Sequence, residues 1–473
     1  MSIGGAFQND MTPRAGEERL ITRLLWNAYL AWHMAGQAGF PFKPLATIKE
    51  IQSRRVRKMV GHAYRTVPYY RETMDRLGLK SGDFRKAEDL AKLPLIEPSR
   101  LQHDPEYFTS TARPARRYLR LHTGGSTGDP RSVYHTPEAI LQNAAHGERE
   151  RCVLTSLVGK RFGYRETVIA SPNCTAHKLQ LFAKSHALMP HRLQIHRQYI
   201  SLMDPTEKNI RLINQFRPDV IQSYGSYLEI LFSHLADTGE FFHRPKVIAF
   251  SSDGLADSVR RLIQERFGIP VFSTYQANEA LKLGFECESH RGLHLNVDLY
   301  PVRIVDASGQ ELPVGEEGEV VVSNLVNAAT VLLNYRLGDI AAFLPETCRC
   351  GRSLPLLSFI PGRCDDLITL PSGRIIHPQA VRTLFTVEDQ VWQYQVVQHS
   401  TTRFSLNIVA SRAADRQKLK ERVAARFLER FGSEARADIS FVDAIDRTAG
   451  GKSRPVISMI RQSASGQPAK WGV

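Results

Sequence analysis

Residues 121–131 read LHTGGSTGDPR, in which three glycines are interleaved with three hydroxyl side chains. Glycine tolerates the backbone conformations that point successive N–H groups into one concavity, and such a concavity binds anions. The groups that this loop offers to a phosphate chain belong to Thr123, Gly124, Gly125, Ser126, Thr127 and Gly128. The stretch therefore predicts a phosphate-binding loop.

Two other classes of glycine-rich loop, the Walker-type phosphate loop and the nucleophile elbow of hydrolases, have similar patterns. A Walker-type phosphate loop ends in Gly-Lys-Ser/Thr, whereas Asp129 and Pro130 follow the last glycine here, which excludes that class. Residues 124–128 also satisfy the G-x-S-x-G pattern of an α/β-hydrolase elbow, which would make Ser126 an esterase nucleophile. Such an elbow opens directly into a helix, and the extended run at 132–134 argues against it.

The pattern beyond the loop predicts an α/β fold. Short β-rich runs alternate with amphipathic segments, and the expected strands are 168–170, 220–224, 247–250 and 271–275. This alternation predicts a mostly parallel sheet flanked by helices. Ligands of such sheets bind at the carboxyl ends of the strands, where the polar clusters 251–253 and 275–279 fall.

The chain has 473 residues and is too long for one core, so several domains are expected. Long β-runs predict a β-rich subdomain at about 295–360, and a strand-helix-strand pattern follows it. We expect a disordered tail at 1–16, a large N-terminal domain at 17–363, a small mobile α+β domain at 364–462 and a second disordered tail at 463–473.

The charge balance favours anionic partners. The net charge of +14 suits nucleotides, CoA or other polyanions, although an arginine-rich chain is equally often simply basic. No basic run with interleaved aromatics indicates a nucleic-acid surface, so that class of partner is not expected.

The N-terminal region predicts neither a secretory signal nor a transmembrane segment, and six cysteines in a chain of this length do not form a disulfide framework. A cytoplasmic location is therefore expected. One helical face carries Leu20, Leu24, Leu25, Ala28, Tyr29 and Trp32. We expect this face to pack on the protein itself, with a membrane surface or a homodimer contact as the alternatives.

Five segments occur in an order that resembles the adenylate-forming superfamily of acyl-CoA synthetases, adenylation domains and luciferases. They are the loop at 121–131, YQANE at 275–279, YRLGD at 335–339, GRCDD at 362–366 and RTAGGK at 447–452. Within that superfamily the chain is most similar to phenylacetate–CoA ligases and their capsule-biosynthesis relatives. The segments AYRTVPYY at 63–70, LPL at 93–95 and CRCGR at 348–352 carry that similarity.

The resemblance implies an ATP-dependent ligase that activates a carboxylic acid, aromatic or arylacetic, as acyl-AMP and transfers the acyl group to CoA. One alternative keeps the adenylate but passes the acyl group to an amine or a carrier-protein thiol. Alternatives of another class are the Ser126 esterase and a non-catalytic nucleotide-binding protein of a capsule pathway.

The resemblance also implies roles for the most reactive side chains. Lys452 would place an ammonium on the carboxylate and phosphoryl oxygens where charge builds. Glu279 would contact Mg²⁺, which takes one or two carboxylates in such sites. Asp339 would accept hydrogen bonds from the ribose hydroxyls, since an ionised carboxylate only accepts.

Further residues complete the implied nucleotide site. Tyr275 offers a flat face to adenine, with a packed core tyrosine as the alternative. Arg363 would reach the ribose, and Asp365 stands where the superfamily hinges its C-terminal domain. The remaining nucleotide contacts are expected from Ser252, Asp253, Gln276 and Asn278.

Two features bear on the acyl pocket. Gln276 replaces the glycine that is usual in the superfamily, which would narrow the pocket. Residues 173–177 follow a strand and either line the pocket or form a surface loop.

The cysteines suggest a separate metal site. Cys287, Cys348 and Cys350 with His294 supply three thiolates and an imidazole, which suit tetrahedral structural Zn²⁺. His290 competes with His294 as the fourth ligand, and buried free cysteines are the alternative interpretation.

Overall fold

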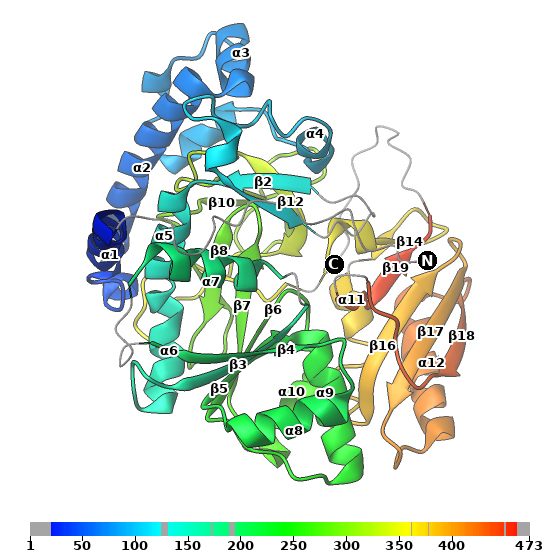
Figure 1. Cartoon of the computed structure of the whole chain (residues 1–473). Coiled ribbons are helices and arrows are strands. Elements are labelled where there is room, and N and C mark those ends of the chain that lie inside the picture. Colours follow the sequence, from blue (N-terminus) through cyan, green and yellow to red (C-terminus); the bar gives the residue numbers. More distant parts are fainter. Residues whose placement is uncertain are drawn as a thin grey trace, which may run out of the picture.

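The computed structural model describes residues 20–123, 131–171, 174–188, 194–360, 362–376, 378–448 and 451–460. A large N-terminal part and a smaller C-terminal part lie side by side (Figure 1). The tails expected at 1–16 and 463–473, and the loop residues 124–128, lie outside the described residues.

The centre of the large part is an eight-stranded sheet with the order β13-β9-β8-β7-β6-β5-β3-β4. The strands are β3 (Arg165–Ala170), β4 (His196–Ser201), β5 (Val220–Tyr224), β6 (Val247–Ser251), β7 (Val271–Ala277), β8 (Leu281–Glu286), β9 (Leu293–Leu295) and β13 (Leu356–Leu357). Neighbours from β4 to β7 run parallel, and β8, β9 and β13 add antiparallel strands. The predicted α/β class with a mostly parallel sheet is confirmed.

Helices cover both faces of this sheet because successive strand residues point to opposite sides. On one face, Ile169, Ile200, Ile221 and Ile248 pack with α8 (Thr206–Phe216), α9 (Gly225–Thr238) and α10 (Asp257–Arg261). On the other face, Val220 and Val247 share a core with α6 (Glu148–Val158). The helices α5 (Pro137–His146) and α7 (Thr175–His186) also lie in this part.

Smaller elements surround the main sheet. A hairpin of β1 (Leu119–Thr123) and β2 (Arg131–His135) flanks the phosphate loop, and β10 (Val302–Val305), β11 (Gly318–Val322) and β12 (Tyr335–Ala341) form a three-stranded antiparallel sheet. The N-terminal helices are α1 (Leu20–Met34), α2 (Leu45–Thr66), α3 (Pro68–Arg76) and α4 (Pro98–His103).

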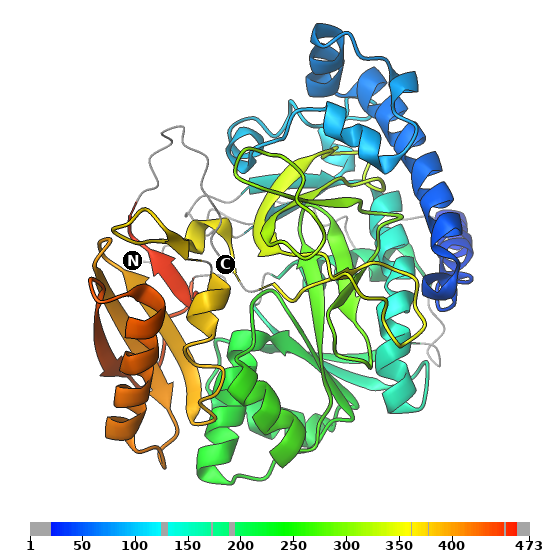
Figure 2. The same cartoon turned by 180° about the vertical axis from the view of Figure 1, so that it is seen from behind.

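The C-terminal part has its own core and a four-stranded sheet with the order β18-β17-β16-β19. Its strands are β14 (Ile368–Thr369), β15 (Ile375–Ile376), β16 (Val391–Gln398), β17 (Arg403–Ala410), β18 (Arg436–Phe441) and β19 (Val456–Ser458). Its helices are α11 (Pro378–Arg382) and α12 (Arg416–Phe431), and α12 covers one face of the sheet (Figure 2). The side chain of Asp415 caps α12 by accepting from the Lys418 N–H.

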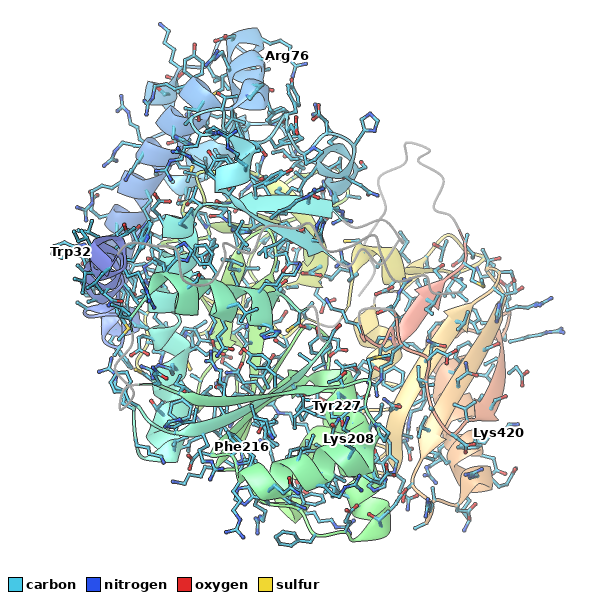
Figure 3. All side chains as sticks on the ribbon, in the orientation of Figure 1. Trp32, Arg76, Lys208, Phe216, Tyr227 and Lys420 are labelled. Carbon is cyan, nitrogen blue, oxygen red and sulfur yellow. The ribbon has the colours of Figure 1, made fainter. Side chains whose placement is uncertain are left out.

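The apolar face predicted to bury α1 is exposed, so that prediction is wrong. Leu20, Leu24, Leu25 and Trp32 are 53–80% exposed, and Trp32 lies at the outer edge of the molecule (Figure 3). The opposite face docks instead, because Arg23 donates to the Ala187 carbonyl and Asn27 exchanges hydrogen bonds with the Leu188 backbone. Among the helices of the described residues, none has the length and apolar character needed to cross a bilayer.

Candidate active site

A cavity of about 2190 Å³ opens at the carboxyl ends of β3, β5, β6 and β7. Residues from all five sequence segments line it: Arg131, Tyr275 to Glu279, Asp339, Arg363 and Lys452. The cavity lies where ligands of parallel sheets bind. Arg131 and Lys452 are 321 positions apart in the chain, and the structure brings both to this cavity.

Glu279 is a buried carboxylate at the end of the turn that follows β7. Its Oε1 lies 3.8 Å from Arg131 Nη1 and accepts a hydrogen bond of 3.4 Å from the Tyr335 hydroxyl. Burial raises the pKa of Glu279, while the Arg131 guanidinium lowers it. Arg131 begins β2 and lines the same cavity, so its guanidinium and the Glu279 carboxylate face each other there.

Tyr275 and Asp339 are joined by a hydrogen bond of 2.8 Å from the Tyr275 hydroxyl to Asp339 Oδ2. Arg363 Nη1 lies 3.7 Å from the other carboxylate oxygen of Asp339. Tyr275 is only 6% exposed and belongs to the main core, but it also lines the cavity. The tyrosine is therefore a packed core residue whose hydroxyl orients Asp339.

Gly338 makes the approach of Arg363 to this pair possible. Its φ of +77° is a left-handed conformation, and a Cβ there would lie 2.8 Å from Arg363 Nη2. The guanidinium donates through the same atom to the Leu337 carbonyl at 3.0 Å. A side chain at position 338 would displace Arg363 from Asp339.

Asp253 occupies the carboxyl end of β6, next to the N-terminus of α9. Its carboxylate accepts from the Ser226 N–H at 3.2 Å, the Ser226 hydroxyl at 2.5 Å and the Ser453 N–H at 3.3 Å. Burial raises the pKa of Asp253, while these hydrogen bonds and the charge of Lys452 lower it. The Asp253 carboxylate, expected among the nucleotide contacts, joins α9 to the C-terminal loop, while its neighbour Ser252 lines the cavity with a left-handed φ of +78°.

The close packing at Asp253 depends on Gly225. A Cβ at Gly225 would lie 2.1 Å from the Gly254 carbonyl oxygen, which is far inside contact distance. The first turn of α9 can therefore approach the strand end only with glycine at this position.

Lys452 lies on a loop that returns from Arg447 to Ser453. The loop is closed by a hydrogen bond from the Thr448 N–H to the Lys452 carbonyl at 2.9 Å. Arg447 docks it on the large part, because its guanidinium donates to the Leu202 carbonyl at 3.4 Å and stacks 5.4 Å from the Tyr227 ring centre. This docking brings Lys452 to the cavity.

Asn278, predicted among the nucleotide contacts, forms hydrogen bonds to three neighbouring elements. Its side chain accepts from the Thr175 hydroxyl at 2.8 Å and donates to the His122 carbonyl at 3.1 Å. Its own carbonyl accepts from His135 Nε2 at 2.9 Å. The residue thereby ties β1, β2 and α7 to the segment that carries Glu279.

The remaining predicted residues are placed as follows. Gln276, Cys174, Thr175 and Ala176 line the cavity, whereas Asn173 and the side chains of Thr123 and Asp365 lie outside what the structure describes. At the expected hinge, the neighbouring Asp366 accepts from Arg454 at 2.7 Å.

The two parts share an extensive contact that no pattern in the sequence predicts. Arg261 donates to Asp389, Arg382 forms an ion pair with Asp257, and Gln393 Nε2 donates to Glu229 at 3.1 Å. Burial raises the pKa of Glu229 to about 8. No local pattern in the sequence pairs α9 and α10 with β16, so this contact could not be read from it.

The four expected metal ligands form a compact cluster away from Lys452. The ligand atoms of Cys287, His294, Cys348 and Cys350 all lie within 4.8 Å of one another. The Cys287 and Cys348 sulfurs are 3.6 Å apart, and Cys350 Sγ lies 3.3 Å from His294 Nε2. His294 Nδ1 donates to the Leu354 carbonyl at 3.1 Å, which leaves Nε2 as the ligand atom.

The competing histidine is engaged elsewhere. His290 Nδ1 lies 2.7 Å from Glu286, so the structure brings His294 rather than His290 to the cysteines. Three thiolates and one imidazole at these separations fit a tetrahedral zinc site.

Two family models match the chain: "AMP-binding enzyme" over residues 49–330 and "CapK C-terminal domain" over residues 368–459. The phenylacetate-coenzyme A ligase of Thermus thermophilus is 26% identical over 84% of this chain and 86% of that protein. Protein CapK of Staphylococcus aureus is 21% identical over 87% and 89%.

Solved structures share the fold. The 2-hydroxyisobutyryl-CoA ligase in the postadenylation state, in complex with R3-HIB-AMP, superposes with a TM-score of 0.73 at 19% identity and covers 88% of this chain and 90% of its own. The same ligase in the thioesterification state, with 2-HIB-AMP and CoA, gives a TM-score of 0.57 at 18% identity over the same shares.

Proposed function

Because the chain belongs to the AMP-binding enzyme family, in its phenylacetate–CoA ligase-like branch, we propose that it is an AMP-forming acid–CoA ligase. The carrying observation is the docking of the Lys452 loop at the cavity that Glu279 and Asp339 line. A carboxylate oxygen of the acid attacks the α-phosphorus of ATP, and pyrophosphate leaves. The thiol of CoA then attacks the acyl carbonyl, and AMP leaves with the electron pair of the broken bond.

Lys452 stabilises the first transition state in this proposal. Its ammonium interacts with the carboxylate oxygen that attacks and with the phosphoryl oxygens on which charge builds. The phosphate loop connects β1 to β2, which begins at Arg131, and it holds the β- and γ-phosphates of ATP. Asp339, oriented by Tyr275 and Arg363, accepts the ribose hydroxyls.

Glu279 fits the metal that such a reaction uses. It is a buried carboxylate that lines the cavity beside the end of the phosphate loop, and carboxylates are ligands that Mg²⁺ accepts. A Mg²⁺ ion held there supplies positive charge to the phosphates. Arg131 and Tyr335 fix the position of the carboxylate.

The C-terminal part would act at two stages. The whole chain, with this part docked, superposes better on the postadenylation structure than on the thioesterification structure, with TM-scores of 0.73 and 0.57. This difference supports a domain that presents Lys452 for adenylation and then turns about the segment near Asp365 to admit CoA.

The Cys287–His294–Cys348–Cys350 cluster would hold zinc as a structural ion. Cys348 and Cys350 belong to the loop before β13, while Cys287 and His294 bracket the turn between β8 and β9. A bound ion would join these segments. None of the six cysteines, all of which lie in the described residues, forms a disulfide, which supports the proposed location in a reducing compartment, the cytoplasm.

Acid-dependent formation of an acyl hydroxamate, in the presence of Mg·ATP and hydroxylamine, tests the function. A panel of arylacetic, aromatic and fatty acids covers the predicted substrates. Thioester formation with CoA, compared with an amine or a carrier protein, identifies the acceptor. Ester hydrolysis without ATP would support the Ser126 esterase instead, and nucleotide binding without turnover would support a binding protein.

A further inference from the structure

The cavity extends past the reacting groups and along one face of β3, β4 and β5. In the parallel register Ala170 pairs with Ser201, Val168 with Tyr199 and Glu166 with Arg197, and these side chains share that face. Arg197 is four strand positions below Ser201, about 13 Å at 3.3 Å per residue. The arginine side chain itself spans part of that length.

The upper part of this extension has walls that suit the hydrocarbon body of an acid. Tyr199 and Val168 line this space, and the Tyr199 ring is held from behind by a tilted stack 4.5 Å from the His177 ring. Tyr224 lines the cavity together with Cys174 and Asp253, so it connects this region to the reacting end. A planar or aliphatic chain can lie against these side chains.

The lower end is charged. The Arg197 guanidinium donates through Nε to Glu166, and Gln222 Nε2 donates to the other Glu166 oxygen at 2.8 Å. Glu166 is 1% exposed, so its carboxylate is enclosed and satisfied by these two donors. The Arg197 side chain keeps 28% of its surface and lines the cavity.

The Arg197 guanidinium therefore has more N–H donors than Glu166 and Tyr199 can accept. A guanidinium carries five N–H groups, and neither Glu166 nor the neighbouring Tyr199 phenol can use all of them. An acid that ended in an unsubstituted ring or a methyl group would displace water from the Arg197 guanidinium and offer it no hydrogen bond. Such burial of a charged group is unfavourable. An oxygen placed there would accept a charge-assisted hydrogen bond.

We infer that the acid activated by this chain carries an oxygen-bearing group at the end remote from its reacting carboxylate, and that Arg197 binds that group. This inference rests on the proposed ligase function and narrows the expected aromatic or arylacetic substrates. The group is a hydroxyl, carbonyl or carboxylate, all of which accept from a guanidinium. Arg197 is a specificity-determining residue and takes no part in the chemistry at the carboxyl carbon.

The test compares matched acids that differ only at the remote end. The pairs are phenylacetate with para-hydroxyphenylacetate, and hexanoate with its hydroxylated analogue and with adipate. The readout is kcat/KM for acyl hydroxamate formation. We expect the oxygenated member to be favoured about 10- to 100-fold, as for a hydrogen bond to a charged group.

Arg197→Met should lower kcat/KM for the oxygenated acids by a similar factor and leave the unsubstituted acids unchanged or better. Arg54→Met, at an exposed arginine on α2, is the matched control and should change neither. Because the single variant leaves Glu166 buried without its cation, the double variant Glu166→Gln/Arg197→Met is measured beside it, with thermal unfolding as the check on folding.

The outcomes separate the two proposals. Two results would overturn the inference while adenylation stands. One is a wild-type kcat/KM for the unsubstituted acid that equals or exceeds the value for its oxygenated partner. The other is an equal loss of kcat/KM on both members of a pair in the folded double variant. Absence of turnover with every acid, although ATP binds, overturns the ligase function itself. Preference for adipate or for the hydroxylated acids identifies which oxygen group the site takes.

Discussion

The backbone N–H of Ser453 donates to the Asp253 carboxylate across 3.3 Å and so fixes the loop of Lys452 against the carboxyl end of β6. The same carboxylate accepts from both the N–H and the hydroxyl of Ser226 at the start of α9. This half-buried acid therefore acts together with Arg447 in setting where the C-terminal loop meets the large part of the molecule.

Asp253→Ala should lower the rate of adenylation about 10-fold or more, because the variant loses charge-assisted hydrogen bonds that hold the loop. The rate of thioester formation from a supplied acyl adenylate should change little, since that stage needs the loop released. Rapid-quench measurement of the two half-reactions checks this. Asp204→Ala, at a more exposed acid paired with Lys208, is the control, and equal losses in both half-reactions would contradict the role.

Tyr275→Phe should raise the KM for ATP about 5- to 10-fold, the effect of one lost hydrogen bond, with a smaller change in kcat. The reason is that Asp339 loses the hydroxyl that orients it at 2.8 Å. Steady-state kinetics over a range of ATP concentrations provides the measurement. Tyr64→Phe, at an exposed tyrosine bonded to Asp75, serves as the control. An unchanged KM would show that Tyr275 contributes only to the core.

The stability of the protein should fall as the pH rises through 8, in part because of Glu229. Its folded pKa of about 8 lies above the ordinary value of 4.5, so the native state holds a proton that the unfolded state releases. The loss of stability from this group begins above about pH 4.5 and is complete above about pH 8. Asp253, Arg382 and the Gln393 amide are the groups that face this carboxyl.

Glu229→Gln keeps an acceptor for the Ala256 N–H and cannot ionise. The difference in melting temperature between variant and wild type should therefore grow in favour of the variant from pH 6 to pH 9. Melting curves at several pH values measure this difference. Parallel pH profiles would contradict the assignment.

Purified protein should contain one zinc ion per chain, and Cys348→Ser should lose it together with several degrees of thermal stability. The cluster atoms lie within 4.8 Å of one another, so removal of one thiolate breaks the tetrahedron. Cys152→Ser, at a cysteine outside the cluster, should keep both the zinc and the stability. Elemental analysis decides the matter, and a wild-type protein without zinc would contradict the proposal.

The parts of the fold that follow local patterns could be predicted from the sequence. The runs that form β5, β6 and β7 each open with two apolar residues and are rich in β-branched and aromatic side chains, which favour strands. The pattern did not predict β4, because its sequence HRQYIS lies at the edge of the sheet and places Arg197 and Tyr199 toward the cavity.

Structural features that depend on contacts between distant segments, such as the buried face of a helix, could not be predicted. Periodicity identified α1 as a helix but not its buried face, which is decided by hydrogen bonds from Arg23 and Asn27 to the end of α7. Spacing likewise left His290 and His294 as rivals, and the pairing of β9 with β13 brings His294 to the cysteines. The engagement of Asp253 with Ser453 spans 200 positions and leaves no trace in either segment.

Lys452→Ala tests the central claim most directly, with acyl hydroxamate formation from Mg·ATP as the readout. We predict a loss of about 100- to 1000-fold in adenylation, as for removal of one group that stabilises transition-state charge. ATP binding and thioester formation from a supplied acyl adenylate should both be kept. Adenylation at the wild-type rate in this variant would contradict the assignment of the cavity as the site of acyl-adenylate formation.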